Sequence, residues 1–183
     1  MSVRATDRAG NVAHASFSVV VTERRTDALK IEDPIAIARE ATGPSGAVVD
    51  YRVKAREARH GDVPVTCLPA SGATFPIGET IVTCQATFDG TTEEATFTVT
   101  VRDTRPPVLD LPDRITVETT SRLGAIVSYT ATATDLVDGS VPVVCAPASG
   151  SRFAMGRTDV RCTATDRAGN TRDGSFEVVV REK

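Results

Sequence analysis

The sequence predicts an all-β protein made of tandem antiparallel β-sandwiches, and three observations lead to that fold class. The apolar residues are mainly Val, Ala and Ile, and Thr is abundant. β-branched side chains suit a pleated, half-buried surface better than a helix. Apolar and polar residues alternate with a period of two, and no segment has convincing helical spacing. The sequence also repeats itself, which is typical of modular proteins.

The internal repeat is long and has one register. A shift of 78 positions pairs residues 31–87 with residues 109–165 without a gap, and 25 of the 57 pairs are identical. A second match pairs residues 5–21 with residues 164–180, with 12 of 17 positions identical. We therefore expect the chain to begin inside a repeat. The predicted units are a C-terminal remnant at 1–23 and complete domains at 28–102 and 103–183.

Each predicted strand follows from alternation, and each break follows from a turn signal. The alternating segments of the middle repeat are Val49-Tyr51-Val53, Val63-Val65-Cys67, Val82-Cys84-Ala86 and Phe97-Val99-Val101. The turn signals are Ser71-Gly72, Ile77-Gly78, Asp89-Gly90 and Ala168-Gly169-Asn170. Short strands separated at such intervals indicate sandwiches of antiparallel strands.

Two connections and the first hairpin complete the predicted architecture. The connection after Val101 ends in Pro106-Pro107, and two consecutive prolines favour a stiff, extended link. The connection at 22–32 has no such pair and is expected to be looser. In the remnant, a turn at Ala9-Gly10-Asn11 predicts that residues 3–7 fold back on 15–21. Phe17, Val19 and Val21 would form its apolar face.

The four cysteines form two equivalent pairs, Cys67 with Cys84 and Cys145 with Cys162. All four alternate in phase with apolar neighbours, so their thiols should face the core. A structural disulfide within each repeat is the natural interpretation, and it requires oxidising surroundings. Two alternatives stay open. Zinc usually needs a closer Cys spacing or His ligands, and reduced thiols would be kept in an intracellular protein.

The motif around these cysteines resembles the hyalin repeat (HYR) domain. It reads Cys-x-Pro-x-Ser-Gly-x-x-Phe-x-x-Gly-x-Thr-x-Val-x-Cys-x-Ala-Thr, followed in the last repeat by Asp-Arg-Ala-Gly-Asn and Ser-Phe-x-Val-x-Val. Asp103, Pro106-Pro107 and Asp138-Gly139 also fit the pattern. The resemblance covers nearly the whole chain. It implies an immunoglobulin-like fold, an extracellular location and a role in adhesion as a module of a larger mosaic protein.

The chain departs from this family at two places. Many members carry two further cysteines, where this chain has Leu111 and Gly174, which suggests that one disulfide is lost as a whole. In the middle repeat, Phe88-Asp89-Gly90 replaces the Asp-Arg-Ala-Gly-Asn turn with a shorter hairpin, so its tip should present a different surface.

Charge and hydropathy exclude several classes of partner. The formal net charge is −3, from 21 basic and 24 acidic residues that are interspersed, so there is no basic stripe for nucleic acid. The sequence contains no run of 18 apolar residues, which a membrane-spanning helix would need. The segment after Met1 lacks the apolar core of a signal peptide. We therefore expect neither a nucleic-acid partner nor a membrane span in this segment.

No residue pattern predicts catalysis, a cofactor or a metal. His14 and His60 are scattered, and Ser71 and Ser149 are explained by turn chemistry. Asp135 and Asp138 offer carboxylates to calcium, but without EF-hand spacing they are interpreted as a solvated turn, with a weak calcium site as the alternative.

Asp7 and Asp166 open identical Asp-Arg-Ala-Gly-Asn stretches, in which the Asp side chain caps the turn and Gly-Asn takes positive φ. Turn structure alone therefore accounts for both aspartates.

The predicted function is that of a non-catalytic extracellular array, acting as a spacer or adhesion module within a larger secreted or cell-surface protein. The expected partner is an extracellular protein or matrix component, and the chain itself is expected to be monomeric. The alternative is a carbohydrate-binding accessory module of a secreted polysaccharide-active enzyme. Sugar rings stack on exposed aromatic side chains, but Trp is absent, and Phe88 is the only aromatic residue whose position beside a turn predicts exposure.

Overall fold

The structure is a computed structural model that describes residues 2–16 and 29–183, and every element in these two ranges is a β-strand. None of the described segments forms a helix of the length and apolar character needed to cross a membrane. The all-β fold class predicted from the alternating pattern is confirmed.

The first two strands form an antiparallel hairpin. Strand β1 (Ser2–Thr6) pairs with β2 (Val12–Ser16), so that Val3 lies opposite Ala15. The turn between them places Gly10 at φ 84°. Phe17, Val19 and Val21, the predicted apolar face of this segment, lie outside the described residues.

Residues 30–102 form a first sandwich unit, whose main sheet has the order β4-β11-β10-β8. The opposing strands form the sheets β3-β6-β7 and β5-β9. The bounds are β3 (Lys30–Ile31), β4 (Ile37–Glu40), β5 (Ala47–Val49), β6 (Ala55–Glu57), β7 (Gly61–Val63), β8 (Val65–Leu68), β9 (Ala73–Phe75), β10 (Gly78–Phe88) and β11 (Thr91–Arg102).

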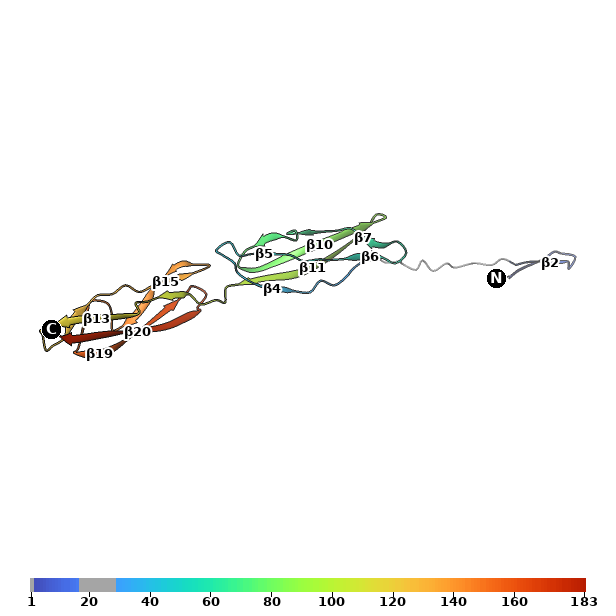
Figure 1. Cartoon of the computed structure of the whole chain (residues 1–183). Coiled ribbons are helices and arrows are strands. Elements are labelled where there is room, and N and C mark those ends of the chain that lie inside the picture. The colour runs from blue at the N-terminus through green and yellow to red at the C-terminus, as the bar shows by residue number, and fades with distance from the viewer. Residues whose placement is uncertain (1, 17–28) are drawn as a thin grey trace.

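Residues 108–182 form a second unit with the same arrangement: a main sheet β13-β20-β19-β17, opposed by β12-β15-β16 and β14-β18. The bounds are β12 (Val108–Asp110), β13 (Arg114–Thr119), β14 (Ala125–Val127), β15 (Thr132–Asp135), β16 (Gly139–Val141), β17 (Val143–Ala146), β18 (Ser151–Phe153), β19 (Gly156–Thr165) and β20 (Thr171–Glu182). Figure 1 shows the two units lying end to end.

Each unit contains one parallel pair among its antiparallel strands. Strand β4 runs parallel to β11, and β13 runs parallel to β20. Parallel neighbours need a long crossover, and here the chain passes through the rest of the sandwich before it returns. The predicted sandwiches are therefore correct in class, but their main sheets are mixed at one edge.

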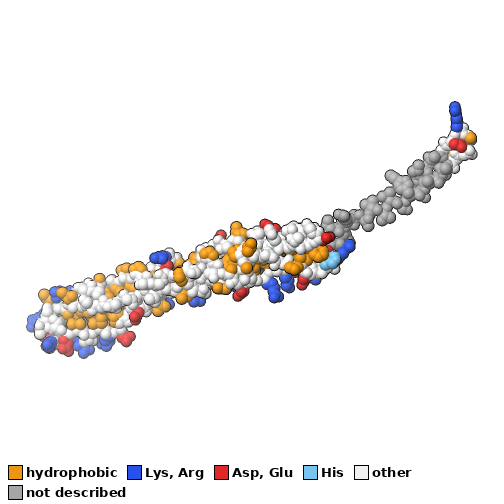
Figure 2. Space-filling model, turned by 90° about the horizontal axis from the view of Figure 1, so that it is seen from above, with side chains coloured by type: hydrophobic (Ala, Val, Ile, Leu, Met, Phe, Trp, Pro, Cys, Tyr) orange, Lys and Arg blue, Asp and Glu red, His pale blue; other side chains and the backbone are white. Residues whose placement is uncertain are grey.

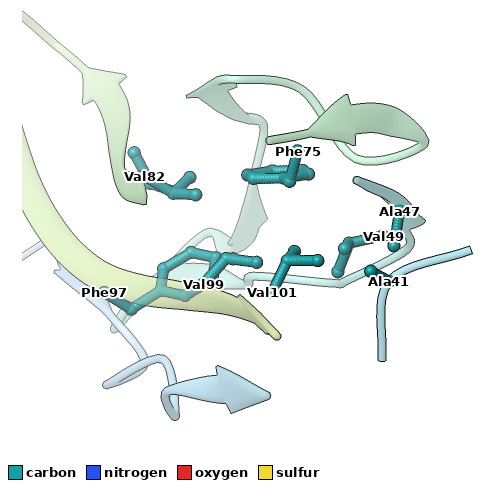
Figure 3. Packing of buried hydrophobic residues seen from close by; sticks show 9 residues of the cluster. Ala41, Ala47, Val49, Phe75, Val82, Phe97, Val99 and Val101 are labelled. Carbon is teal, nitrogen blue, oxygen red and sulfur yellow. The ribbon is translucent and has the colours of Figure 1, made fainter. Parts of the chain in front are cut away.

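Alternation places the core between the sheets, as expected from the sequence. In the first unit, Val82, Val99 and Val101 face Phe75 and Val49, and all five are fully buried. Figure 3 shows these side chains gathered between the strands. In the second unit, Val160, Val178, Val180 and Phe153 occupy the same positions. Burial of such side chains is the main favourable contribution to folding.

Two predicted strands are interrupted. The Val49-Tyr51-Val53 segment is strand only up to Val49, because the backbone N–H of Tyr51 donates to the side-chain hydroxyl of Ser71 (2.9 Å) and not to a neighbouring strand. The Val63-Val65-Cys67 segment is split between β7 and β8 at Pro64, which has no N–H for the ladder.

Candidate functional site

The connection between the two units is hydrogen-bonded to both. On one side, the backbone N–H and the hydroxyl of Thr104 donate to the Glu40 carboxylate, at 2.9 and 2.6 Å. On the other side, the Asn170 amide Nδ2 donates to the carbonyl oxygen of Asp103 (3.3 Å). Pro107 is fully buried. The predicted stiff link is thus anchored by side chains from each unit as well as by its prolines.

The turn between β15 and β16 reaches from the second unit to the first. Val137, at its tip, packs against the core cluster that contains Val99 and Val101. The side chain of Asp135 shapes this turn, because its Oδ1 accepts the backbone N–H groups of Val137 (2.7 Å) and Asp138 (2.9 Å). Asp135 thus fixes the loop that contacts the neighbouring unit.

A second loop beside it is organised by Asp166. The Asp166 carboxylate accepts both the backbone N–H of Asn170 (2.7 Å) and its side-chain Nδ2 (2.8 Å). Asp7 makes the same two bonds to Asn11, each at 2.9 Å. The predicted capping role of these aspartates agrees with the bonds, although positive φ falls on Gly10 and Gly169 and on neither Asn.

Three carboxylates meet where these segments converge. One oxygen of each of Asp103, Asp135 and Asp166 lies within 4.8 Å of the others. Asp135 and Asp166 are only 9% and 7% exposed. The Oδ2 atom of Asp103 is buried and accepts no hydrogen bond from the described residues. We call Asp103, Asp135 and Asp166 the acidic junction; among the described residues, they form the one group of three or more potential metal-ligating side chains.

The electrostatics of the acidic junction follow from burial and crowding. Desolvation raises the pKa of Asp103, and repulsion from Asp135, Asp166 and Glu40 adds to it, against one lowering hydrogen bond from the Arg105 N–H. The pKa of Glu40 is lowered, because the Thr104 hydroxyl and N–H hold its charged form.

The corresponding end of the first unit is built differently. Glu57, which aligns with Asp135, is 5% exposed and contacts His60 Nδ1 at 2.6 Å. Burial raises the pKa of Glu57, but hydrogen bonds from His60 and the Arg59 N–H outweigh it, and the pKa is lowered overall. Glu57 therefore has His60 as a partner. Among the described residues, the acidic junction has no such histidine.

The cysteines lie on adjacent strands of each main sheet. Cys67 on β8 is directly opposite Cys84 on β10, and Cys145 on β17 is opposite Cys162 on β19. Each pair forms a disulfide. Cys84 and Cys162 are buried, whereas their partners are half-buried. Two disulfides are typical of proteins folded in an oxidising compartment.

The other residues singled out in the sequence do not assemble into one site. Asp138 lies beside the acidic junction and pairs with Arg167, through the backbone N–H (2.7 Å) and the guanidinium (3.7 Å). Ser71 and Ser149 accept the backbone N–H groups of Tyr51 and Tyr129, which lie twenty residues away, so these bonds differ from the local turn bonds that the sequence predicts. His14 lies in β2, and its side chain is outside the described part.

The aromatic inventory offers no stacking platform in the described residues. Phe75, Phe97, Phe153 and Phe176 are buried, and Tyr51 and Tyr129 are half-buried. Phe88, the one residue expected to be exposed, is half-buried, and its ring lies 4.9 Å from that of His60. Figure 2 shows hydrophobic groups in scattered patches and charges of both signs interspersed on the visible face.

Sequence reasoning found Asp135 but missed the site it belongs to. Asp103 was noted only as part of the family pattern, and Asp166 was explained by its turn. Asp103 follows β11 of the first unit, whereas Asp135 ends β15 and Asp166 follows β19 of the second unit. The sequence does not show that these strand ends meet.

Comparison with known proteins gives consistent relatives. Residues 102–180 match the HYR domain model. Hyalin from Lytechinus variegatus is 31% identical over 192 residues, covering 97% of this chain and 35% of the relative. Hyalin from Strongylocentrotus purpuratus is 31% identical over 186 residues, covering 96% of this chain and 16% of the relative. The chain thus spans about a third or less of these proteins.

The solved structures that align with this chain include cadherin repeats. Protocadherin Gamma B2 extracellular cadherin domains 3–6 align with 98% of this chain and 56% of that chain, at 17% identity and a TM-score of 0.41. The protocadherin gammaB7 EC3-6 structure aligns with 98% and 57%, at 14% identity and a TM-score of 0.42. The sequence match is the more specific finding: residues 102–180 are similar to the HYR domain.

Proposed function

We propose that the chain is a non-catalytic segment of an extracellular protein, serving as a stiff spacer or adhesion module. The observation that carries the proposal is the junction: Glu40 and Asn170 bond to the connection from opposite sides, and Val137 packs on the neighbouring core. Such contacts favour a fixed end-to-end arrangement (Figure 1) over freely hinged units.

Residues 28–102 are proposed to be a second HYR domain, and 1–23 the end of a third. Support comes from the strand order, which is the same in both units, and from the Asp7 turn, whose bonds repeat those of the Asp166 turn. The similarity to hyalin over nearly the whole chain agrees with a tandem array.

The proposed location is outside the cell, in a secreted or cell-surface protein. Two disulfides and the similarity to hyalin support it. The proposed partner is another extracellular protein, contacted through loops and sheet faces, while the chain itself remains monomeric.

The spacer proposal is tested by small-angle X-ray scattering of the 183-residue chain at several concentrations. A monomeric, elongated particle is expected, whose distance distribution shows the two units in line. A compact particle with the units side by side, or a distribution typical of freely jointed units, would contradict a stiff spacer. Concentration-dependent growth in mass would contradict the monomer.

A further inference from the structure

The acidic junction has the dimensions of a calcium site. Its three ligand oxygens come from separate segments, after β11, at the end of β15 and after β19, and they lie within 4.8 Å of one another. Calcium binds oxygen at about 2.3–2.6 Å, so two of its ligands can lie up to about 5.2 Å apart. One ion can therefore reach all three carboxylates.

The acidic junction also lacks a partner for its charge. Asp103 Oδ2 is buried without a hydrogen-bond donor, and none of its three aspartates forms an ion pair with a Lys, Arg or His of the described residues. By contrast, the buried Glu57 pairs with His60, and the half-buried Glu177 pairs with Arg114 and Arg157. An unpaired buried carboxylate is costly, and coordination to a cation removes that cost.

Two of the three carboxylates are held in position before any ion binds. Asp135 Oδ1 is fixed by the N–H groups of Val137 and Asp138, and Asp166 by the backbone and side chain of Asn170. These bonds occupy part of each carboxylate and leave lone pairs free for a metal. A pre-arranged ligand set reduces the entropy lost on binding.

The donor set selects the kind of metal. All three ligands are carboxylate oxygens, which suit calcium and magnesium, whereas zinc and copper prefer sites that include nitrogen or sulfur. Magnesium demands a near-ideal octahedron, while calcium accepts six to eight ligands in flexible geometry. Ligands drawn from three separate segments match the flexible geometry of calcium better than the strict octahedron of magnesium.

We propose that Asp103, Asp135 and Asp166 bind one calcium ion at the junction, which fixes the connecting segment to the second unit. The ion would hold Asp103, while the adjacent Thr104 is bonded to Glu40 of the first unit. Calcium would thereby stiffen the joint between the units. The corresponding end of the first unit has the Glu57–His60 pair instead, so a single site per chain is expected.

The proposal is tested by isothermal titration calorimetry of metal-free chain with CaCl₂ and, separately, MgCl₂. One calcium ion per chain is expected, with a dissociation constant on the order of 10⁻⁴–10⁻³ M, as in extracellular modules. Asp103→Asn should weaken binding about tenfold or more, through loss of one charged ligand. Absence of calcium binding up to about ten times the expected constant would overturn the site, and equal affinity for magnesium would overturn the choice of metal.

Matched variants separate the site from general effects of charge. Asp7→Asn alters the same Asp-Arg-Ala-Gly-Asn turn as Asp166→Asn, but away from the acidic junction. Asp110→Asn removes an exposed carboxylate close to Asp103 in the sequence. Asp166→Asn should weaken calcium binding, whereas Asp7→Asn and Asp110→Asn should leave it unchanged. Equal losses in all variants would contradict a specific site.

Thermal unfolding gives a second readout that does not depend on adhesion. Calcium should raise the melting temperature of the wild-type chain, and at the same calcium concentration it should raise that of Asp103→Asn by less, since stabilisation by a ligand falls as its affinity falls. The circular dichroism spectrum of the variant checks that it folds. If calcium binds but does not narrow the distribution of inter-unit distances in scattering, the claim that it stiffens the joint is wrong, while the binding site stands. If the spacer proposal fails, the calcium-binding result is unaffected.

Discussion

At the scale of single residues, the clearest constraint falls on two glycines. Gly46 and its equivalent Gly124 have φ of 100° and 87°, in the left-handed region that favours glycine. A Cβ at either position would lie 1.9 Å from a backbone carbonyl oxygen, that of Phe75 or Phe153. These carbonyls belong to β9 and β18, so neither can move without disturbing a strand.

Gly124→Ala should therefore lower the unfolding free energy of the second unit by more than the cost of its left-handed φ alone. Gly150→Ala is the matched control, because Gly150 has φ 83° but nothing within 4 Å of its added Cβ. A residue forced into this region costs roughly 1–2 kcal/mol, and the backbone clash adds to it in Gly124→Ala only. Urea unfolding measures both variants, and equal losses would show that the carbonyl yields easily.

The disulfides give a second residue-scale prediction. Peptide mapping under non-reducing conditions should find Cys67 joined to Cys84 and Cys145 to Cys162, with no free thiol. Replacing Cys145 and Cys162 together by Ser should lower the stability of the second unit by about 3 kcal/mol, by the loop-entropy estimate. A bond between the two units, such as Cys67 to Cys145, would refute the assignment of one disulfide to each sandwich.

The residue-level result shows what alternation can and cannot predict. It placed Cys84, Cys162 and the core valines correctly, because side-chain direction in a strand depends only on local periodicity. It could not bring Asp103, Asp135 and Asp166 together, because their distance depends on how three strand ends converge. Asp135 was recognised as a possible ligand, but it was grouped with Asp138, which pairs with Arg167 instead.

At the scale of elements, the connecting segment depends on one carboxylate. The hydroxyl and N–H of Thr104 lower the pKa of Glu40 in the folded chain below its ordinary value of 4.5. A lowered folded pKa means that this contribution to stability is complete above the unfolded pKa and is lost as pH falls through the folded one. The contact between Glu40 and the connection should therefore weaken under acid conditions.

Acidification below about pH 4.5 should consequently loosen the connection in the wild type. In Glu40→Gln, which keeps an oxygen acceptor but cannot titrate, that component should be absent. The comparison uses the difference in unfolding free energy between the two proteins as a function of pH, so that the titration of groups that do not interact with Glu40 cancels. A difference that stays constant from pH 7 to about pH 3 would contradict a structural role for the Glu40 charge.

Strand boundaries also show the limits of local pattern. The segment after Val49 has alternating apolar residues, yet it leaves the ladder because Ser71, twenty residues away, accepts the Tyr51 N–H. Tyr129 and Ser149 make the same bond in the second unit. A side chain that replaces a strand partner can be identified only when the fold brings it near. The long strands β10, β11, β19 and β20 have no such competitor and were predicted well.

At the scale of the whole molecule, the repeat of 78 positions predicted two similar units, and the identical strand orders agree with it. The contact between the units was beyond sequence reasoning. Val137 lies on a turn that was expected to be solvated, but it packs against the core of the first unit. Whether a turn residue meets solvent or a neighbouring unit depends on the relative placement of the two sandwiches.

Val137→Ala should weaken the coupling between the units without unfolding either one. Removal of two methylene-sized groups from a half-buried contact costs about 1 kcal/mol. Leu136→Ala is the control, because Leu136 lies in the same turn and is 55% exposed. Scattering should show broader inter-unit distances for Val137→Ala only. Identical curves for all three proteins would mean that the hydrogen-bonded connection alone sets the arrangement.

The parallel strand pair at the edge of each main sheet has a consequence for a chain under tension. Force applied to the two ends of the chain enters the second unit ahead of β13 and leaves it through β20. These two strands are parallel neighbours. The load then pulls these neighbours past each other along their length. Their six paired positions must yield together instead of opening one after another, as a hairpin would. The first unit has only four paired positions between β4 and β11, which makes it the weaker link in the pulled chain.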